Sequence, residues 1–142
     1  MIRKAKSSDI PEVVKIETAS FTHPWEESLF FDTLSANGKY FFVYESDNKP
    51  VAYIIFETVL DEGNITDLAV EAKYRNKGIG KELIEKTLSL AKELKIKSIF
   101  LEVRESNEAA RKLYRKLGFK LLGKRKGYYP KNEDALTYIY EI

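Results

Sequence analysis

The spacing of apolar positions changes several times along the chain, and four stretches have the spacing of amphipathic helices. Apolar side chains recur every three to four positions over residues 10–20 and 26–35, and again over residues 83–94. A fourth helix is predicted over residues 107–117, because Gly118 follows it as a C-terminal stop. These helices would each bury one face against a sheet.

Runs rich in β-branched and aromatic residues lie between the helices and are typical of strands. Two of these runs flank the turn-forming stretch 47–50 and predict a hairpin. The resulting order, βααβββαβαββ, indicates an α/β (α+β) fold with a mixed central sheet flanked by helices. One domain over residues 1–142 is expected, because no linker, repeat or low-complexity segment divides the chain. The predicted strands are residues 2–5, 39–45, 51–57, 64–70, 97–103, 119–122 and 135–140.

The first helix begins with a capping signal. Asp9 is expected to cap the helix, and Pro11 suits its first turn. Glu12 would close a capping box with Asp9.

Composition and charge exclude several classes of function. The chain has no cysteine and one histidine, so disulfides, thiolate metal sites and a histidine-based metal centre are excluded. A serine triad would need His23, which we interpret as a surface or loop residue, and no nucleophile elbow is present. The net charge of +2 does not argue for nucleic acid, and no apolar run would span a membrane. The N-terminus has no secretory signal, and a soluble, cytoplasmic protein is predicted.

A basic, glycine-containing loop at residues 75–80 lies between a predicted strand and a long helix. Its two glycines let the backbone direct several N–H groups to one point, at the positive end of the helix dipole. A diphosphate fits such donors better than a single carboxylate does. The loop lacks the features of nucleotide-triphosphate and dinucleotide loops, and a glycine turn on a solvated basic loop is the alternative. The basic side chains are Lys73, Arg75, Lys77 and Lys81.

This loop resembles the signature of the GNAT superfamily of acetyl-CoA-dependent N-acetyltransferases, Gln/Arg-x-x-Gly-x-Gly/Ala. The resemblance implies that the loop binds the coenzyme A pyrophosphate. Residues 65–70 are similar to the family's fourth strand, whose bulged backbone at Leu68, Ala69 and Val70 holds the pantetheine arm and the acetyl group. N–H groups near Ala69 and Val70 would then stabilise the oxyanion. The implied acetyl-CoA-binding set is Leu68, Ala69, Val70, Arg75, Asn76, Lys77, Gly78, Ile79, Gly80, Lys81, Asn107 and Tyr114.

Later pieces are similar to the RimI-type protein N-terminal acetyltransferases: residues 101–104, 106–107, 109–110, 113–114 before 118–119, and 127–130. The resemblance implies that Glu102 is the general base and that Tyr114 protonates the departing sulfur.

Both catalytic residues have structural alternatives. Strand alternation sets Glu102 opposite Leu101 and Val103, where it could instead be an edge-strand carboxylate paired with Arg104 or a lysine. A phenol with a pKa near ~10 can donate to a thiolate of ~8.5, yet Tyr114 could also be a core tyrosine.

Asn107 has two compatible roles. Either Asn107 or Ser106 is expected to cap the following helix, and the resemblance implies that the Asn107 side chain also holds the cofactor arm.

Aromatic residues are the candidates for binding the acceptor, because tyrosine offers a rigid apolar face with a hydroxyl. Aromatic packing between strands is their alternative role. The candidates are Phe21, Trp25, Tyr128 and Tyr129.

The resemblance implies a protein N-terminus as the acceptor. The RimI type implies an N-terminal alanine of a small-subunit ribosomal protein, whereas the archaeal relatives imply a broader set of N-termini, and both remain open. The chemistry agrees, since an α-amino group of pKa ~8 is about a tenth neutral at pH 7 and a lysine of ~10.4 is less than about a thousandth neutral. Acetylation of lysines or small amines is one alternative. A non-catalytic coenzyme A-binding module is another, against which Glu102 and Tyr114 weigh.

Overall fold

The computed structural model describes Met1–Ile142, and its elements follow the predicted order βααβββαβαββ. The predicted bounds agree to within two residues for most elements. The exceptions are the third helix, which begins at residue 79 instead of 83, and the sixth strand, which is much longer than predicted. The helices are α1 (Ile10–Ser20), α2 (Glu27–Ser35), α3 (Ile79–Glu93) and α4 (Glu108–Lys116). The strands are β1 (Ile2–Lys4), β2 (Lys39–Ser46), β3 (Lys49–Val59), β4 (Glu62–Val70), β5 (Ser98–Arg104), β6 (Lys120–Tyr129) and β7 (Glu133–Glu141).

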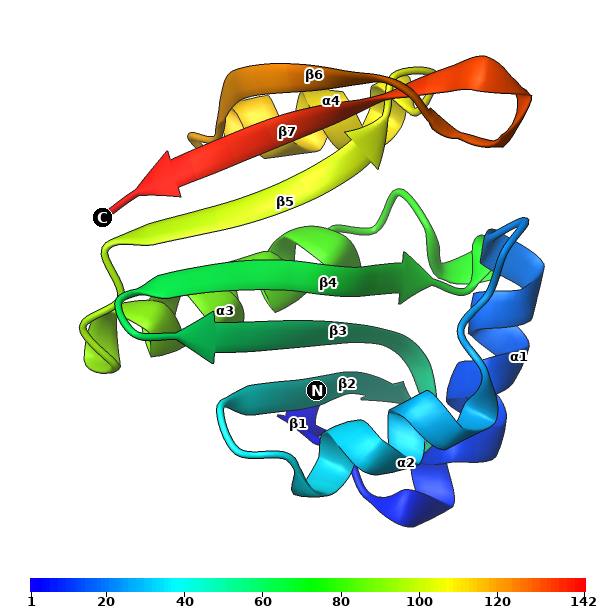
Figure 1. The fold of residues 1–142 in the computed structure, drawn as a ribbon. Coiled ribbons are helices and arrows are strands. Elements are labelled where there is room, and N and C mark those ends of the chain that lie inside the picture. Colours follow the sequence, from blue (N-terminus) through cyan, green and yellow to red (C-terminus); the bar gives the residue numbers. More distant parts are fainter.

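The seven strands form one sheet in the order β1-β2-β3-β4-β5-β7-β6. The β2–β3 hairpin is confirmed, with Asp47 and Asn48 in the left-handed region that its tight turn requires. Only β4 and β5 pair in parallel, because α3 crosses over between them. Figure 1 shows the two halves of the sheet, β1–β4 and β5–β7, one above the other.

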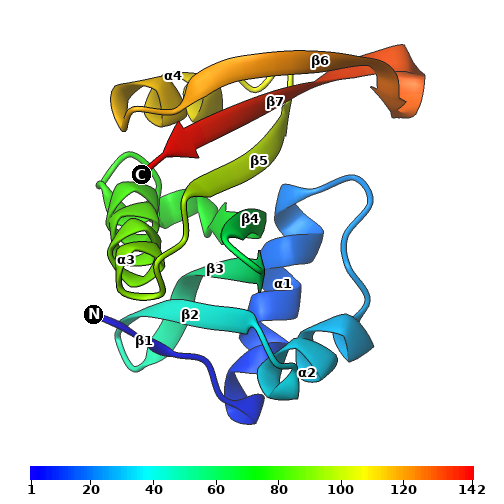
Figure 2. The same ribbon diagram turned by 60° about the vertical axis from the view of Figure 1, so that its left-hand side comes forward.

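Helices cover both faces of the sheet, and alternation along β2 and β3 divides the core between them (Figure 2). Phe41 and Tyr53 pack under α1 and α2. Phe42 and Ile54 face the opposite way and pack under α3. The alternating side-chain directions of a strand explain why neighbouring residues enter different cores. No helix combines the length and apolarity needed to cross a membrane.

The predicted cap of α1 is wrong. Asp9 occupies the N-cap position but has helical backbone angles, and its side chain makes no cap bond. Its carboxylate instead accepts two hydrogen bonds from Arg3, at 2.7 and 2.8 Å, and one from the Lys6 N–H. Glu12 therefore closes no capping box with Asp9 and pairs with Lys15 at 3.3 Å. A bidentate ion pair between Arg3 and Asp9 thus takes the place of the cap.

The pairing of β4 with β5 is short, and the two strands then diverge (Figure 1). Their register covers only Glu62–Asn64 against Ser98–Phe100. On its other side, β4 carries a bulge at Thr66, because Ile55 pairs with Asp67 while Phe56 pairs with Ile65. The bulge expected at Leu68–Val70 is therefore misplaced, since those three residues pair regularly with β3. The divergence leaves the β5-facing edge of β4 without a partner strand.

Candidate active site

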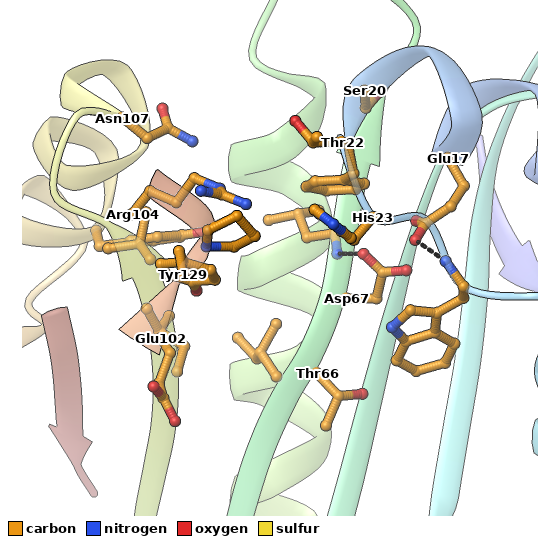
Figure 3. A pocket seen from close by; sticks show the side chains of 18 residues that line it. Glu17, Ser20, Thr22, His23, Thr66, Asp67, Glu102, Arg104, Asn107 and Tyr129 are labelled. Carbon is orange, nitrogen blue, oxygen red and sulfur yellow. Dashed lines mark hydrogen bonds between the residues drawn. The ribbon is translucent and has the colours of Figure 1, made fainter. Parts of the chain in front are cut away.

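A cavity of about 440 Å³ opens where β4 and β5 diverge. Its walls come from α1, the 20–25 segment, β4, β5, α4 and the end of β6, as Figure 3 shows. A wider groove of about 820 Å³ shares Trp25, Glu102 and Tyr129 with the cavity and extends past Arg125 and Tyr128. We call the first the inner cavity and the second the outer groove. Because they share these lining residues, the two spaces adjoin each other.

Glu102 lies on the β5 wall of both spaces. The predicted alternation is confirmed, since Leu101 and Val103 are buried and Glu102 is exposed between them. Its Oε1 lies 3.3 Å from the Arg125 Nη2. Arg104, the partner expected in the structural alternative, pairs instead with Glu133 at 2.9 Å. Glu102 thus presents a carboxylate, held by one arginine, to the space between the strands.

Tyr114 lines the inner cavity from α4 and is nearly buried, with 8% of its surface exposed. Its ring packs against Phe119 and Tyr138, at centroid distances of 5.8 and 6.3 Å. Burial, and after it the charges of Tyr129 and Asp67, raises the pKa of Tyr114 to about 12. The phenol is therefore protonated at neutral pH. Tyr114 packs in the core and also lines the cavity, so its two predicted environments do not exclude each other.

The cap of α4 is confirmed at Asn107, whose Oδ1 accepts a 3.2 Å hydrogen bond from the Ala110 N–H. Ser106 does not serve as the cap, because its hydroxyl donates to Glu133. Asn107 also lines the inner cavity. A contact between Asn107 and a bound cofactor stays a prediction.

The basic loop offers a row of unused backbone donors. None of the N–H groups of residues 76–81 donates to a backbone or side-chain oxygen, and the first helical bond is from Glu82 to Gly78. Gly78 has a φ of +81°, which an L side chain rarely adopts, and open space lies beside it. The Arg75 Nε donates to the Val70 carbonyl at 2.9 Å and ties the loop to β4. Free donors at the start of a 15-residue helix fit a diphosphate.

Two backbone donors of β4 face the space between the strands. The Glu71 N–H donates to the Val51 carbonyl, so in this antiparallel ladder the Ala69 N–H also points toward β3. The N–H groups of Leu68 and Val70 point the opposite way. Of the two donors expected near Ala69 and Val70, only the Val70 N–H points into this space, and the Leu68 N–H joins it there. Their role in stabilising an oxyanion stays a prediction. The Leu68 N–H already donates to the Asp67 Oδ1 at 2.9 Å.

The aromatic candidates divide between the two spaces. Phe21 lines the inner cavity, whereas Trp25 and Tyr129 line both spaces. Tyr128 is 55% exposed and borders only the outer groove, where Arg125 lies over its ring at 5.1 Å. Burial, and then the charge of Glu102, raises the pKa of Tyr129. All four candidates therefore stay near the space where an acceptor would enter.

Several polar residues that line the inner cavity were not predicted as site residues, among them His23, Glu17 and Asp67. His23 lies in the 21–25 loop beside both spaces. Glu17 and Asp67 are buried, with 1% and 8% exposure. Periodicity carried a signal for both, because Glu17 falls seven positions after Ile10 on the apolar face of α1, and Asp67 alternates with Ile65 and Ala69 on β4. No cluster of three or more potential metal ligands is present.

Comparison with known proteins gives consistent matches. Residues 10–119 match the model described as the Acetyltransferase (GNAT) family. The [ribosomal protein bS18]-alanine N-acetyltransferase of Escherichia coli K12 is 32% identical over 95% of this chain and 93% of its own. The N-alpha-acetyltransferase of Saccharolobus solfataricus is 33% identical over 94% and 88%. The crystal structure of the E. coli ribosomal-protein-S18-alanine N-acetyltransferase superposes with a TM-score of 0.93, covering 100% of this chain and 93% of that one at 31% identity.

Proposed function

The chain belongs to the GNAT family of acetyltransferases, and from that premise we propose that it transfers the acetyl group of acetyl-CoA to the α-amino group at the N-terminus of a protein. The observation that carries this proposal is that Glu102 and Tyr114, from different elements, line one cavity. Backbone donors of β4 lie on the opposite wall of that cavity. An acid, a base and an oxyanion donor around one space are what acyl transfer to an amine needs.

The cofactor supplies the acetyl thioester, and the loop at residues 75–80 holds its diphosphate. Six free N–H groups, the helix dipole and the basic side chains Lys77 and Lys81 all favour an anion there. The inward N–H groups of Leu68 and Val70 then bind the carbonyl groups of the acetyl-pantetheine arm. Asn107 contributes its side-chain amide from the α4 side.

Each protein group has one task in the transfer. Glu102 takes a proton from the incoming ammonium, directly or through water, so that the amine becomes a nucleophile. A β4 N–H group stabilises the negative charge that develops on the carbonyl oxygen. Tyr114, with a pKa of about 12, remains a phenol and passes its proton to the sulfur as the C–S bond breaks, so that coenzyme A leaves as a thiol of reference pKa ~8.5. The second proton, which the nitrogen loses as the amide forms, returns to the Tyr114 oxygen and restores the phenol.

The acceptor enters along the outer groove, past Trp25, Tyr128 and Tyr129. The relatives' names support a protein N-terminus, but they differ in its breadth: one names alanine of ribosomal protein bS18 and one names no residue. An α-amino group also suits a single glutamate, because about a tenth of it is neutral at pH 7. We propose a protein N-terminus as the acceptor class, with N-terminal alanine as the first candidate.

Peptide acetylation tests this proposal. Two peptides of one sequence, each with an internal lysine, differ only in a free or a blocked N-terminus. Turnover of the free peptide and none of the blocked one is expected. Preferential acetylation of the blocked peptide would identify a lysine acetyltransferase, and cofactor binding without turnover of any amine would identify a binding module. A series that varies only the first residue then defines the acceptor.

A further inference from the structure

Two buried carboxyl groups, Glu17 and Asp67, meet on the β4 wall of the inner cavity (Figure 3). Glu17 comes from α1 and Asp67 from β4, and both are more than nine-tenths buried. No lysine or arginine forms a salt bridge with either. Two ionised carboxylates in contact, away from water, repel each other strongly, so such a pair retains one proton.

The donors around the pair decide which carboxyl group is protonated. Both oxygens of Glu17 accept hydrogen bonds: Oε1 from the Tyr53 hydroxyl and Oε2 from the backbone N–H of Trp25 at 2.9 Å. Asp67 accepts only one, from the Leu68 N–H to Oδ1. Its Oδ2 is buried without a donor. A proton on that oxygen makes it a donor to Glu17 and completes the network, while the negative charge rests on Glu17, where two donors stabilise it.

We infer that Asp67 is a positioning residue for acetyl transfer: it is held as a neutral acid by Glu17, so that the cavity wall beside the Leu68 amide carries no charge. The inference rests on the proposed site between β4 and β5. A carboxylate at Asp67 would bind the Leu68 N–H strongly and would repel the negative charge that develops on a carbonyl oxygen nearby. A neutral carboxyl oxygen competes for that N–H more weakly. The pair thus keeps the charge on Glu17 of α1 and away from Asp67, whose carboxyl group accepts from the Leu68 N–H.

The titration of the pair agrees with this assignment. Burial, and then the hydrogen bond and the charge of Glu17, raises the pKa of Asp67 to about 9. Asp67 then stays neutral through the physiological range and ionises only in alkaline solution. The titratable groups that face it are Glu17 of α1, Tyr53 of β3 and Tyr114 of α4, with His23, Glu102, Arg104 and Tyr129 across the cavity.

Two substitutions leave the same charge in different places. Asp67→Asn leaves it on Glu17, and the asparagine amide imitates the neutral acid. Glu17→Gln leaves it on Asp67, beside the Leu68 N–H. We expect Glu17→Gln to lower kcat for a free-N-terminus peptide about 10- to 100-fold at pH 7.5. The fall in kcat caused by Asp67→Asn should be at least tenfold smaller than that caused by Glu17→Gln. Glu12→Gln, the same change on the exposed side of α1, is the matched control.

The double variant separates charge from packing. If the misplaced charge causes the loss, Glu17→Gln combined with Asp67→Asn should recover at least fivefold over Glu17→Gln alone. A double variant as slow as Glu17→Gln would overturn the inference, because Glu17 would then act only through packing. Asp67→Asn slower than Glu17→Gln would also overturn it, since an ionisable Asp67 would then be required.

A pH profile gives a second readout that does not depend on the folding of Glu17→Gln. The ratio of wild-type kcat to Asp67→Asn kcat should fall severalfold above pH 9, where only the wild type acquires the second charge. A constant ratio from pH 6 to 10 would overturn the inference. Equal kcat for all variants would do so as well, while turnover of the free and blocked peptides in the same assays would still report separately on the proposed function.

Discussion

The two walls of the inner cavity carry the same kind of side chain in opposite environments. On the β4 side, Glu17 and Asp67 are buried and are held by hydroxyl and N–H donors without a basic partner. On the β5 side, Glu102 keeps 29% of its side chain exposed and pairs with Arg125. A buried pair retains a proton, whereas a carboxylate beside an arginine and water does not. The difference teaches that the accessible carboxylate of the cavity lies on the β5 wall.

The largest expected effect comes from removing that carboxylate. Glu102→Gln keeps the shape but not the proton acceptor, so kcat/KM for a free-N-terminus peptide should fall by about two to four decades at pH 7. The ratio of variant to wild-type activity, measured from pH 6 to 9.5, should rise with pH, because near pH 9 most α-amino groups are already neutral. A variant as active as the wild type would assign Glu102 to structure, and the two walls would then not differ in function.

Removing the acid between the two walls should have the next largest effect. Tyr114→Phe deletes one hydroxyl and keeps the packing against Phe119 and Tyr138. We expect kcat to fall about ten- to a thousandfold, with acetyl-CoA affinity by calorimetry nearly preserved. Tyr138→Phe, which removes a hydroxyl from a neighbouring ring that does not line the cavity, is the matched control. Unchanged kcat in Tyr114→Phe would make Tyr114 a packing residue alone.

A substitution in the 75–80 loop tests cofactor binding and leaves the carboxyl groups of both cavity walls unchanged. A Cβ at Gly80 would lie 3.8 Å from Leu113 and 3.9 Å from Val70, in ordinary contact, so the branches of a valine fill the space between α4 and β4. Gly80→Val should weaken acetyl-CoA binding about 10- to 100-fold by calorimetry while the fold remains. Gly80→Ala should have a much smaller effect. An unchanged dissociation constant in Gly80→Val would separate the loop from the cofactor.

The remaining expected effect is on stability, and it isolates the β4 wall without substrate. The pKa of Asp67 is about 9 in the folded chain, against ~3.9 for an unfolded aspartate. The folded state therefore holds the proton more tightly. The stabilisation from this group is complete below pH ~4 and is lost as pH rises toward 9.

Asp67→Asn has no such loss. Its free energy of unfolding, relative to that of the wild type, should therefore increase between pH 5 and 9, by less than ~1.4 kcal/mol per pH unit. Urea unfolding at pH 5, 7 and 9 measures the gain. A difference that stays constant with pH would mean that Asp67 is ionised in the folded chain and that the two walls are electrostatically alike.

Much of the fold followed from periodicity and turn residues, but β6 shows where periodicity fails. We predicted four residues for this strand, and ten are present. β6 is an edge strand that pairs only with β7 and is exposed along most of its length. Its lysine-rich sequence therefore lacks the apolar alternation that marks a strand. Pairing with β7, which no local pattern encodes, keeps it extended.

The site divides in the same way. Motif spacing identified Glu102, Tyr114, Asn107 and the 75–80 loop, because each keeps its residue type in a recognisable context. Periodicity could have placed Glu17 and Asp67 on apolar faces, although we did not predict them, and only the packing of α1 against β4 brings them together. Which N–H groups of β4 face the cavity depends on register and on the bulge at Thr66, not on side-chain identity. Asp9 was wrongly predicted to cap α1, because its carboxylate accepts hydrogen bonds from Arg3, six residues earlier in the chain.

The short pairing between β4 and β5 also has a thermodynamic consequence. Three residue pairs, with the core beneath α3, join the two halves of the sheet. A ligand that contacts the 75–80 loop, β4 and α4 at once bridges both halves, so its binding free energy adds to the cooperativity of folding. Amide hydrogens of β5–β7 that exchange by sub-global opening would then exchange more slowly as acetyl-CoA concentration rises. A cosubstrate bound in this way would join the two halves of the sheet and would release them when it leaves.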